Sequence, residues 1–397
     1  MDALTTPSNW QRVRLGDVAE IIGGGTPSTQ ITSFWNGSIN WFTPTEIGIT
    51  KYVYKSQRTI TPLGLKKSSA KLLPIGTILL TSRASIGDCA ILKVVATTNQ
   101  GFQSLIPLEK INNEFLYYLI LTLKNKLLEL ASGSTFLEVS PNKIKNLLIP
   151  LPPLNEQIAI ANILSDLDHY LYSLDALILK KESVKKALSF ELLSQRKRLK
   201  GFNQAWQRVR LGDICEFGNG GAYETLIVEN GDFKLISLNS IDIDGNLKNT
   251  MKRVNFYDNS LKQDDIVMVL SDVAHGDFLG LCAVIPSNDY VLNQRMGRLR
   301  IRNDCINILF LRLYINANQK YFKMQGQGSS QLNLSKKAIE DFEIPLPPLN
   351  EQIAIANILS DLDHEIISLK NKKRQFENIK KALNHDLMSA KIRVLKK

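Results

Sequence analysis

The sequence predicts an α+β fold in which two mixed α/β domains are joined by two long antiparallel helices, related by an internal pseudo-two-fold repeat. The first basis is a duplication: residues 149–169 (IPLPPLNEQIAIANILSDLDH) recur without a change at 344–364, an offset of 195 residues. A match of this length at a fixed period marks a repeated architecture. The second basis is the apolar 3/4 spacing that follows each copy, which is typical of a long amphipathic helix.

Each half also opens with a shared stretch, WQRVRLGD, at 10–17 and again at 206–213. Between the opening and closing stretches, β-branched apolar runs bounded by turns predict buried strands, and 3/4 spacing predicts helices. The clearest of these segments are strands at 76–82 and 89–95 and helices at 113–130 and 306–321. We therefore expect mixed α/β domains at residues 1–148 and 201–343.

The two interiors align with each other, although they have diverged. Residues 78–82 (ILLTS) resemble 267–271 (VMVLS), and Asn99-Gln100 resembles Asn293-Gln294. The sequence therefore predicts one fold present twice, with different surface residues.

The proline pairs Pro152-Pro153 and Pro347-Pro348 mark the starts of the two long helices. Proline ends the segment before it and is tolerated in the first turn of a helix. We predict the first helix from Leu154 to Lys200, before Gly201, which is roughly 70 Å at 1.5 Å per residue. Its predicted apolar seam includes Ile158, and that of the second helix includes Ile353. Matching seams in one chain most simply bury each other, so segments 149–200 and 344–397 are expected to pair as an antiparallel coiled coil.

Perfect identity over the repeated stretch exceeds what packing demands, since Leu, Ile and Met interchange in a seam at modest cost. We hypothesise recent recombination between the two halves, which would allow their domains to be exchanged.

Composition bounds the class of protein. The chain has 397 residues, enough for two or more domains, and a net charge of +11 that favours an anionic partner. Residues 1–153 carry 15 basic against 9 acidic side chains, whereas residues 201–348 carry 16 against 17. The four cysteines lie far apart without ligand spacing, so zinc and a disulfide framework are not expected. Neither a secretory signal nor a membrane span is expected, and we predict a cytoplasmic protein.

The sequence lacks several common motifs of catalysis and cofactor binding. It has no G-x-x-x-x-G-K-[ST] phosphate loop, and its glycine clusters lack G-x-G-x-x-G spacing. The Asn- or Asp-Pro-Pro-aromatic signature of amino-methyltransferases is missing too, because leucine precedes both Pro-Pro pairs. We therefore expect no catalytic residues, no metal and no cofactor in this chain, and a chain that is not an enzyme.

Features suited to binding DNA are better represented. Lys and Arg neutralise phosphates, whereas base edges are read by Arg, Asn, Gln, Ser and Thr. Such residues lie in or beside predicted loops of both interiors. In the first interior the candidates are Thr43, Thr45, Lys66, Lys67, Lys71, Ser82, Arg83, Asn99 and Gln100. In the second they are Asn239, Ser240, Ser271, Asp272, His275, Asn293, Gln294 and Arg295, followed by the basic residues Arg298, Arg300 and Arg302.

These residues closely resemble the specificity subunits of type I restriction–modification systems over the whole chain. The resemblance rests on W-x-x-V-x-L-G-D opening each half, on Gly-Gly-Thr-Pro-Ser at 24–28, and on Ser82-Arg83 with Asn99-Gln100-Gly101-Phe102. It rests also on Ile-Pro-Leu-Pro-Pro-Leu-x-Glu-Gln entering each long helix. The second half departs from the pattern, since 218–223 lacks Thr-Pro-Ser and Ser271-Asp272 replaces Ser-Arg.

The resemblance implies two target-recognition domains, at 1–148 and 201–343, on two helical repeats. It implies a DNA-recognition subunit that reads a bipartite, asymmetric site in double-stranded DNA. Two methyltransferase subunits, and restriction subunits through them, would dock on the helices. The predicted docking residues are Leu154, Glu156, Gln157, Leu349, Glu351 and Gln352. S-adenosylmethionine, ATP and Mg would belong to the partner subunits.

Two alternatives remain open. The chain could serve a fused restriction–methylation enzyme of the type IIB kind, or it could be a coiled-coil scaffold that binds proteins and not DNA. A scaffold would show no sequence preference on DNA and little dependence on salt.

Overall fold

The computed structural model describes residues 9–133, 137–273 and 276–394. The chain divides into two compact units. Unit 1 comprises residues 1–176 and 371–397, and unit 2 comprises residues 177–370. Each unit therefore contains one α/β domain together with part of both long helices.

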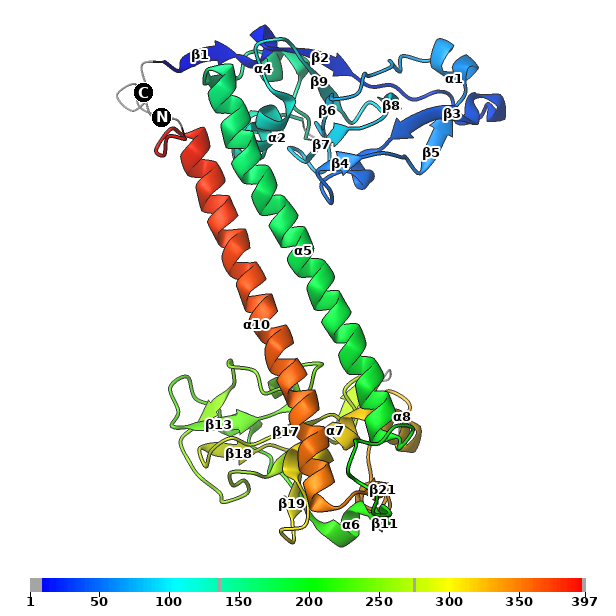
Figure 1. Cartoon of the computed structure of the whole chain (residues 1–397), viewed down its shortest axis with the longest axis vertical. Coiled ribbons are helices and arrows are strands. Elements are labelled where there is room, and N and C mark those ends of the chain that lie inside the picture. Colours follow the sequence, from blue (N-terminus) through cyan, green and yellow to red (C-terminus); the bar gives the residue numbers. More distant parts are fainter. Residues whose placement is uncertain (1–8, 134–136, 274–275, 395–397) are drawn as a thin grey trace. The chain divides into compact units, whose positions relative to one another are not determined.

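The α/β domain of unit 1 is built on two sheets and a two-stranded ribbon (Figure 1). The five-stranded sheet has the order β2-β9-β6-β7-β4, the three-stranded sheet has the order β5-β3-β8, and β1 pairs antiparallel with β10. The strands are β1 (Gln11–Arg14), β2 (Ala19–Gly23), β3 (Trp35–Phe42), β4 (Tyr52–Val53), β5 (Arg58–Ile60), β6 (Ile78–Leu80), β7 (Cys89–Leu92), β8 (Ala96–Thr98), β9 (Gln103–Pro107) and β10 (Leu148–Leu151). The helices are α1 (Pro62–Lys66), α2 (Asn113–Thr122), α3 (Lys124–Leu130) and α4 (Pro141–Lys145).

The α/β domain of unit 2 repeats this topology. Its four-stranded sheet β12-β19-β15-β17 corresponds to β2-β9-β6-β7, β14-β13-β18 corresponds to β5-β3-β8, and β11 pairs with β21 as β1 does with β10. A further ribbon joins β16 and β20. The strands are β11 (Gln207–Arg210), β12 (Cys215–Asn219), β13 (Phe233–Ile236), β14 (Arg253–Val254), β15 (Ile266–Val269), β16 (Ser271–Val273), β17 (Cys282–Val284), β18 (Tyr290–Leu292), β19 (Met296–Ile301), β20 (Gln331–Asn333) and β21 (Glu343–Leu346). The helices are α6 (Leu211–Ile214), α7 (Ile308–Ala317), α8 (Gln319–Gln325) and α9 (Lys336–Glu340).

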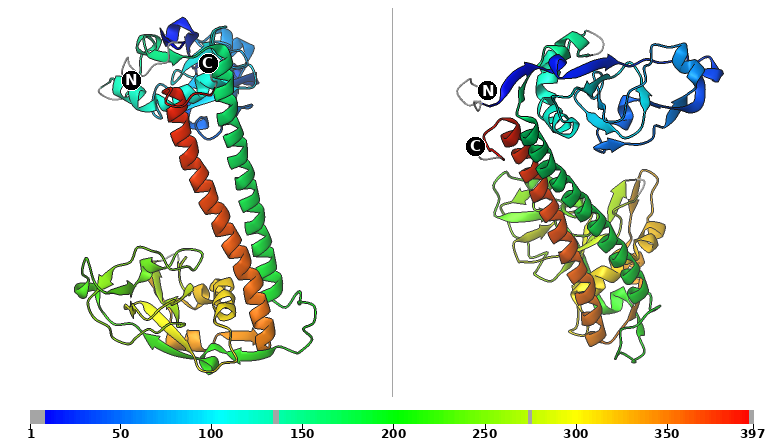
Figure 2. Two further views of the ribbon diagram at one scale, coloured as in Figure 1. Left: turned by 60° about the vertical axis from the view of Figure 1, so that its left-hand side comes forward. Right: turned by 45° about the horizontal axis from the view of Figure 1, so that its top comes forward.

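The long helices are α5 (Leu154–Leu193) and α10 (Leu349–Met388), each of 40 residues. In each unit they lie side by side, as the views of Figures 1 and 2 agree. Their direction is antiparallel, because Asp175 of α5 meets Lys373 of α10 in unit 1 and Glu182 meets Lys370 in unit 2. The predicted antiparallel pairing of the helices is confirmed.

The predicted end of the first helix at Lys200 is wrong. The helix ends at Leu193, because Gln195 adopts a left-handed conformation with φ of 61°. The second helix ends at the repeat-equivalent Met388, and Ala390 takes the same left-handed conformation. This turn directs Arg198 back to the first turn of the other long helix, where it pairs with Glu351.

The predicted seam is wrong in the first turns. Ile158 and Ile353 are 41% and 40% exposed, whereas Ile160 and Ile355 are 1% exposed. The reason is that the first turns pack on their own α/β domain, with Ile160 in the core of unit 1 and Ile355 in that of unit 2. Further along α5, Leu174 and Ile178 are buried, as the seam predicts.

Most of the other predicted elements exist but are shorter. The predicted strands at 76–82 and 89–95 contain β6 and β7, and the predicted helices at 113–130 and 306–321 each divide into two. In the described part of the chain no helix is long and apolar enough to cross a membrane.

Candidate nucleic-acid interface and helix surface

In unit 1 four loops gather beside the ends of β2, β3 and β8. We call them loop cluster 1: residues 24–28, 43–46, 68–71 and 99–101. The Gly25 amide donates to the Thr98 carbonyl at 2.8 Å, and the Asn99 amide donates to the Phe42 carbonyl at 3.0 Å. A Cβ on Gly24 would lie 1.9 Å from the Asn99 carbonyl oxygen, so only glycine fits there. The backbone therefore fixes where the loop side chains emerge.

Loop cluster 1 contains Thr43, Thr45, Lys71, Asn99 and Gln100 of the predicted first-interior residues, and Lys66 and Lys67 precede its segment 68–71 in the chain. Thr45, Lys66, Lys67, Lys71 and Gln100 are exposed, while Thr43, Arg83 and Asn99 are half-buried. The three lysines make no ion pair within the described residues. Loop cluster 1 therefore offers a basic group, Lys71, and hydrogen-bonding groups, those of Thr45 and Gln100, to solvent.

Two predicted residues of unit 1 are committed to contacts within the domain. Ser82 is buried, and its hydroxyl donates to the Gly101 carbonyl at 3.2 Å. Arg83 pairs with Glu138 at 2.8 Å. Ser82 therefore supports the loop at 99–101 from below rather than facing a ligand.

Sequence reasoning missed an arginine stacked on an aromatic pair in unit 1. The exposed Arg58 guanidinium lies 3.8 Å from the centre of the Trp35 ring, and Trp35 packs edge-on against Trp41. The Trp41 indole donates to the Gly25 carbonyl at 2.9 Å, which ties this stack to loop cluster 1. Only the cross-strand register, in which Arg58 faces Trp41, could have signalled it.

Unit 2 contains the equivalent arrangement. We call it loop cluster 2: residues 220–224, 237–240, 270–272 and 293–295. The Asn293 amide donates to the Ile236 carbonyl at 3.0 Å, matching the bond between Asn99 and Phe42, and Gln294 donates to Gly221 at 2.6 Å. A Cβ on Gly220 would lie 2.1 Å from the Asn293 carbonyl oxygen, as at Gly24.

Loop cluster 2 offers fewer of its predicted residues to solvent. Asn239, Gln294 and Arg295 are exposed, and Arg295 lies at the tip with φ of 70°. Asp272 is half-buried and accepts from the Phe278 amide at 2.7 Å. His275 lies outside the described residues.

Three predicted residues of unit 2 are buried. Ser240 donates to the Leu235 carbonyl, Ser271 donates to Asn333, and Asn293 donates to Glu224. Two of the three basic residues that follow form ion pairs within the domain, Arg298 with Glu216 and Arg300 with Asp265. These groups shape loop cluster 2 and hold its strands together.

The helix entrances form a buried clamp in each unit. In the unit 1 clamp the Glu156 carboxylate accepts from the Trp10 indole at 3.2 Å and from Arg393 at 2.7 and 3.1 Å. In the unit 2 clamp Glu351 accepts from Trp206 at 2.9 Å and from Arg198 at 3.1 and 2.6 Å. The members of the two clamps are repeat-equivalent: Trp10, Glu156 and Arg393 correspond to Trp206, Glu351 and Arg198.

The glutamine beside each clamp is also internal. Gln157 donates to the Pro152 and Lys110 carbonyls and accepts from the Asn112 amide. Gln352 makes the same three contacts with Pro347, Cys305 and Asn307. The structure thus places Glu156, Gln157, Glu351 and Gln352, four of the six predicted docking residues, in the interior, where they fix each helix to its domain.

The outward side of the repeated stretch is a stripe along one helix face. Its members recur at spacings of three and four residues and are exposed in both units. We call it the docking stripe: Leu154, Ile158, Asn162, Asp166 and His169 in unit 1, and Leu349, Ile353, Asn357, Asp361 and His364 in unit 2. The two remaining predicted docking residues, Leu154 and Leu349, belong to it.

A polar network fixes the α/β domain of unit 1 to the long helices. Lys51 pairs with Glu114 and donates to the Tyr118 hydroxyl at 2.9 Å and to Ser165 of α5 at 3.2 Å. Tyr118 in turn donates to Asp168 of α5. Burial, aided by this bond to Asp168, raises the pKa of Tyr118, which therefore stays neutral and a donor.

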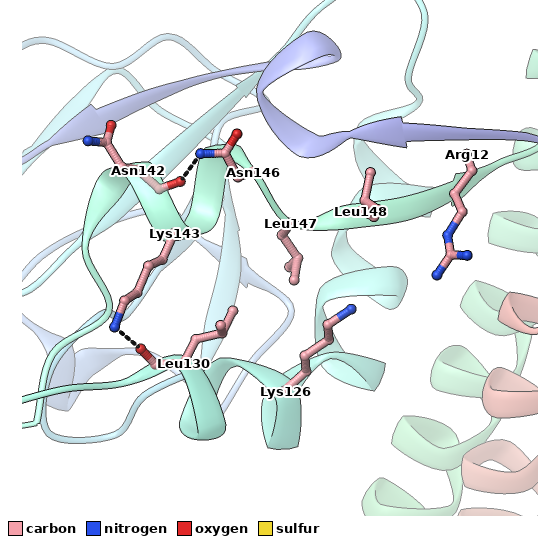
Figure 3. Close-up of a pocket in the computed structure, with 8 residues that line it drawn as sticks. All are labelled: Arg12, Lys126, Leu130, Asn142, Lys143, Asn146, Leu147 and Leu148. Atoms are coloured by element: carbon pink, nitrogen blue, oxygen red, sulfur yellow. Dashed lines mark hydrogen bonds between the residues drawn. The ribbon is translucent and has the colours of Figure 1, made fainter.

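Unit 1 also has a basic pocket of about 410 Å³ between β1, α3, α4 and β10 (Figure 3). Arg12, Lys126 and Lys143 surround apolar side chains that include Leu148, which is 44% exposed. Lys143 donates to the Leu130 carbonyl at 2.8 Å, as Figure 3 shows. In unit 2 the equivalents of Arg12 and Leu148 form an ion pair, Arg208 with Glu343. The unneutralised charge is thus a property of unit 1.

The described residues contain no group of three or more His, Cys, Asp or Glu side chains arranged to hold a metal ion. Burial raises the pKa of the Cys89, Cys215 and Cys282 thiols, that of Cys215 to about 12, so these thiols remain protonated.

The architecture is that of a duplicated recognition protein: two copies of one domain, each with a loop cluster and each clamped on a shared helix pair. A family model described as the type I restriction modification DNA specificity domain matches residues 7–181 and 203–378. The chain therefore belongs to this family and contains its domain twice.

Individual relatives agree with this assignment. The MjaIX specificity subunit of Methanocaldococcus jannaschii, a type I restriction enzyme subunit, is 42% identical over 166 residues. That match covers 41% of this chain and 38% of the relative, so the chain spans about two fifths of that protein's length. The MjaVIII specificity subunit of the same organism is 28% identical to this chain, over 99% of the length of this chain and 95% of the length of the relative. The crystal structure of a type I restriction–modification S subunit from M. genitalium has the same fold, with a TM-score of 0.61, 19% identity and 96% of both chains covered.

Proposed function

We propose that this chain is the DNA-recognition subunit of a type I restriction–modification complex and reads a bipartite, asymmetric site in double-stranded DNA. One observation supports this most directly: the same backbone scaffold presents loop clusters 1 and 2, but the exposed side chains differ. Phosphate contacts position a protein on DNA and base contacts specify the sequence. Two clusters with different side chains therefore read two different half-sites.

The proposed DNA contacts are mostly exposed side chains of the clusters and their surroundings. Around loop cluster 1 they are the exposed Thr45, Arg58, Lys66, Lys67, Lys71 and Gln100 and the half-buried Thr43 and Asn99, and in loop cluster 2 they are the exposed Asn239, Gln294 and Arg295. Lysines serve as phosphate contacts, whereas Gln, Asn and Arg have the paired groups that recognise adenine and guanine edges.

The docking stripe supports two copies of one methyltransferase partner. Its exposed residues are identical in both units, so each unit offers one partner the same apolar and polar groups. Restriction subunits would join through the methyltransferases. In this proposal S-adenosylmethionine, ATP and Mg belong to the partners, and the present chain contributes recognition and no catalytic residue. Since its ligand is cellular DNA, it would act in the cytoplasm.

The fused restriction–methylation enzyme remains an alternative partner, since it would use the same clusters and the same stripe. A protein scaffold is a weaker alternative, because it gives no reason for exposed lysines beside loop cluster 1.

Genome-wide sequencing of methylated adenine, in cells with the gene present and deleted, tests the proposal. We expect deletion to abolish methylation at one split, asymmetric motif. Gln100→Ala should relax one half of that motif, and Arg295→Ala the other half. An unchanged methylome, with the partner methyltransferase expressed and active, would contradict the proposal. The subunit that copurifies with the chain distinguishes a separate methyltransferase from a fused enzyme.

A further inference from the structure

The long helices are identical in part and different in part, and the contacts between them follow this division. The clamps match across the repeat, and so do the ion pairs of Asp168 with Lys380 in unit 1 and Asp363 with Lys185 in unit 2. These contacts would form equally well between any two copies of either helix. They cannot tell one half of the chain from the other.

The contacts in the diverged segments, 170–181 and 365–376, are different. In unit 1 Tyr170 packs on Phe376 with ring centres 4.7 Å apart. The repeat-equivalent residues in unit 2 are Glu365 and Lys181, which form an ion pair at 2.7 Å. One position of the interface is thus an aromatic pair in one unit and a charge pair in the other.

A second position behaves in the same way. In unit 1 Asp175 pairs with Lys373 at 2.6 Å. The repeat-equivalents in unit 2 are Lys370 and Ile178, of which Ile178 is buried and Lys370 reaches Glu182 at 2.7 Å. Glutamate occupies the position of Glu182 in both helices, as Glu182 and Glu377, so in this contact only the position of Lys370, which is Asp175 in the first helix, differs.

We propose that these four positions in each helix form a pairing code by which the first helix fits the second helix and not a second copy of itself. The first helix reads Tyr170, Asp175, Ile178 and Lys181. The second reads Glu365, Lys370, Lys373 and Phe376. The partner that this surface fits is the complementary half of the chain.

The mismatched pairings show why the code selects. Two helices of the second kind would place Lys opposite Lys twice and Glu opposite Phe twice. Two helices of the first kind would place Asp opposite Ile twice and would lose the ion pairs that Lys373, Glu365 and Lys370 make. Like charges held opposite each other are destabilising, and a carboxylate beside a buried apolar side chain loses solvation without gaining a partner.

The selection has a consequence for a duplicated chain. The identical ends allow every half to bind every other half, so without a discriminating segment two copies of the chain could associate first half with first half. The code gives the correct pairing, first half with second half, the lowest free energy. It acts within the chain, and it is independent of which DNA sequence or partner the chain binds.

Variants of the full-length chain test this, because both helices then remain at the same effective concentration. Variant A, Tyr170→Glu/Asp175→Lys/Ile178→Lys/Lys181→Phe, gives both helices the second code. Variant B, Glu365→Tyr/Lys370→Asp/Lys373→Ile/Phe376→Lys, gives both the first code. Variant C combines all eight changes and exchanges the codes.

We expect variants A and B each to lower the midpoint of thermal unfolding by about 5–10 °C. This estimate combines the free energy of the exposed ion pairs that are lost, and of the like charges that are brought together, with the midpoint shift expected for a unit of this size. Variant C should recover more than half of that loss, because every complementary pair is restored with its members exchanged. Added salt should raise the midpoint of variant A towards that of the wild type, since its defect is repulsion between lysines. The proposal is overturned if variant C is as unstable as A and B together, or if A and B unfold at the wild-type temperature.

Discussion

Replacing Glu351 by glutamine would test whether the unit 2 clamp holds the second long helix on its domain. The Glu351 side chain is 0% exposed and accepts three hydrogen bonds, two from Arg198 and one from Trp206. Glutamine keeps the volume but removes the charge and one acceptor oxygen. The indole of Trp206 then loses a charged partner that water cannot fully replace.

The magnitude follows from the kind of bond lost. A hydrogen bond to a charged group contributes about 1.5–3 kcal/mol and a neutral one about 0.5–1.5 kcal/mol, so the indole bond alone should lose about 1–2 kcal/mol. A unit of roughly 200 residues shifts its midpoint by about 2–4 °C per kcal/mol. We therefore expect Glu351→Gln to lower the midpoint of unit 2 by about 2–8 °C. Arg198 should lose less, because its outer face reaches solvent.

The assay should resolve the two units. Hydrogen–deuterium exchange followed by mass spectrometry should show faster exchange at residues 349–356 and 206–210 in Glu351→Gln. In Glu156→Gln it should instead show faster exchange at the repeat-equivalent segments of unit 1. Asp361→Asn is the matched control, because Asp361 is an exposed acid on the same helix. Exchange unchanged at the first turn of α10, or changed equally by Asp361→Asn, would refute the clamp.

Three further outcomes follow from the surfaces. Ile158→Arg and Ile353→Arg should each leave the midpoint of thermal unfolding within about 1 °C of the wild-type value, because both side chains are largely exposed. Native mass spectrometry should show that each variant binds one copy of the methyltransferase where the wild type binds two. Retention of both copies would argue against the docking stripe. The triple variant Lys66→Ala/Lys67→Ala/Lys71→Ala should reduce the magnitude of the slope of log K for DNA binding against log salt concentration by about 2–3, since each phosphate contact contributes about 0.9. The control Lys180→Ala/Lys186→Ala, on an exposed part of α5, should leave this slope unchanged. Equal slopes in both variants would exclude the three lysines as phosphate contacts. Under native conditions a thiol reagent should modify only Cys305, the exposed cysteine, and all four after denaturation; rapid native modification of Cys89, Cys215 or Cys282 would show that the domain cores open.

Much of the fold could be predicted from the sequence because its signals are local or repeated. The duplication, the antiparallel helices and the main strands all follow from periodicity and identity. The gathering of 43–46 with 99–101 does not follow from the sequence, because it depends on which strands are neighbours in the sheet. Parallel pairing of β3 with β8 then places Phe42 beside Asn99.

The roles of the buried polar residues could not be predicted. Ser82, Ser240, Ser271 and Asn293 lie in or beside turns and strand ends, and a serine there looks the same in sequence whether it faces solvent or bonds to a neighbouring segment. Glu156 has the same ambiguity, because an acid in the first turn of a helix is usually solvated. Its partners lie 146 and 237 residues away along the chain, and only the folded structure brings them together.

The structure also separates two causes of the identity between residues 149–169 and 344–364. Identity at Glu156, Gln157 and Ala161 is required by the clamp and by close packing, so the fold alone accounts for it. The fold does not account for identity at exposed positions such as Asn162 and Asp166, where no described contact within the chain constrains the side chain. Recombination would homogenise buried and exposed positions alike, whereas selection by a shared partner would act on the exposed stripe. Since the exposed identity ends at His169 and His364, where the pairing code begins, a docked partner should contact both stripes up to that turn and no further. Asn162→Arg should then weaken partner binding, while Tyr172→Arg, on exposed helix surface just beyond the stripe, should leave partner binding unchanged.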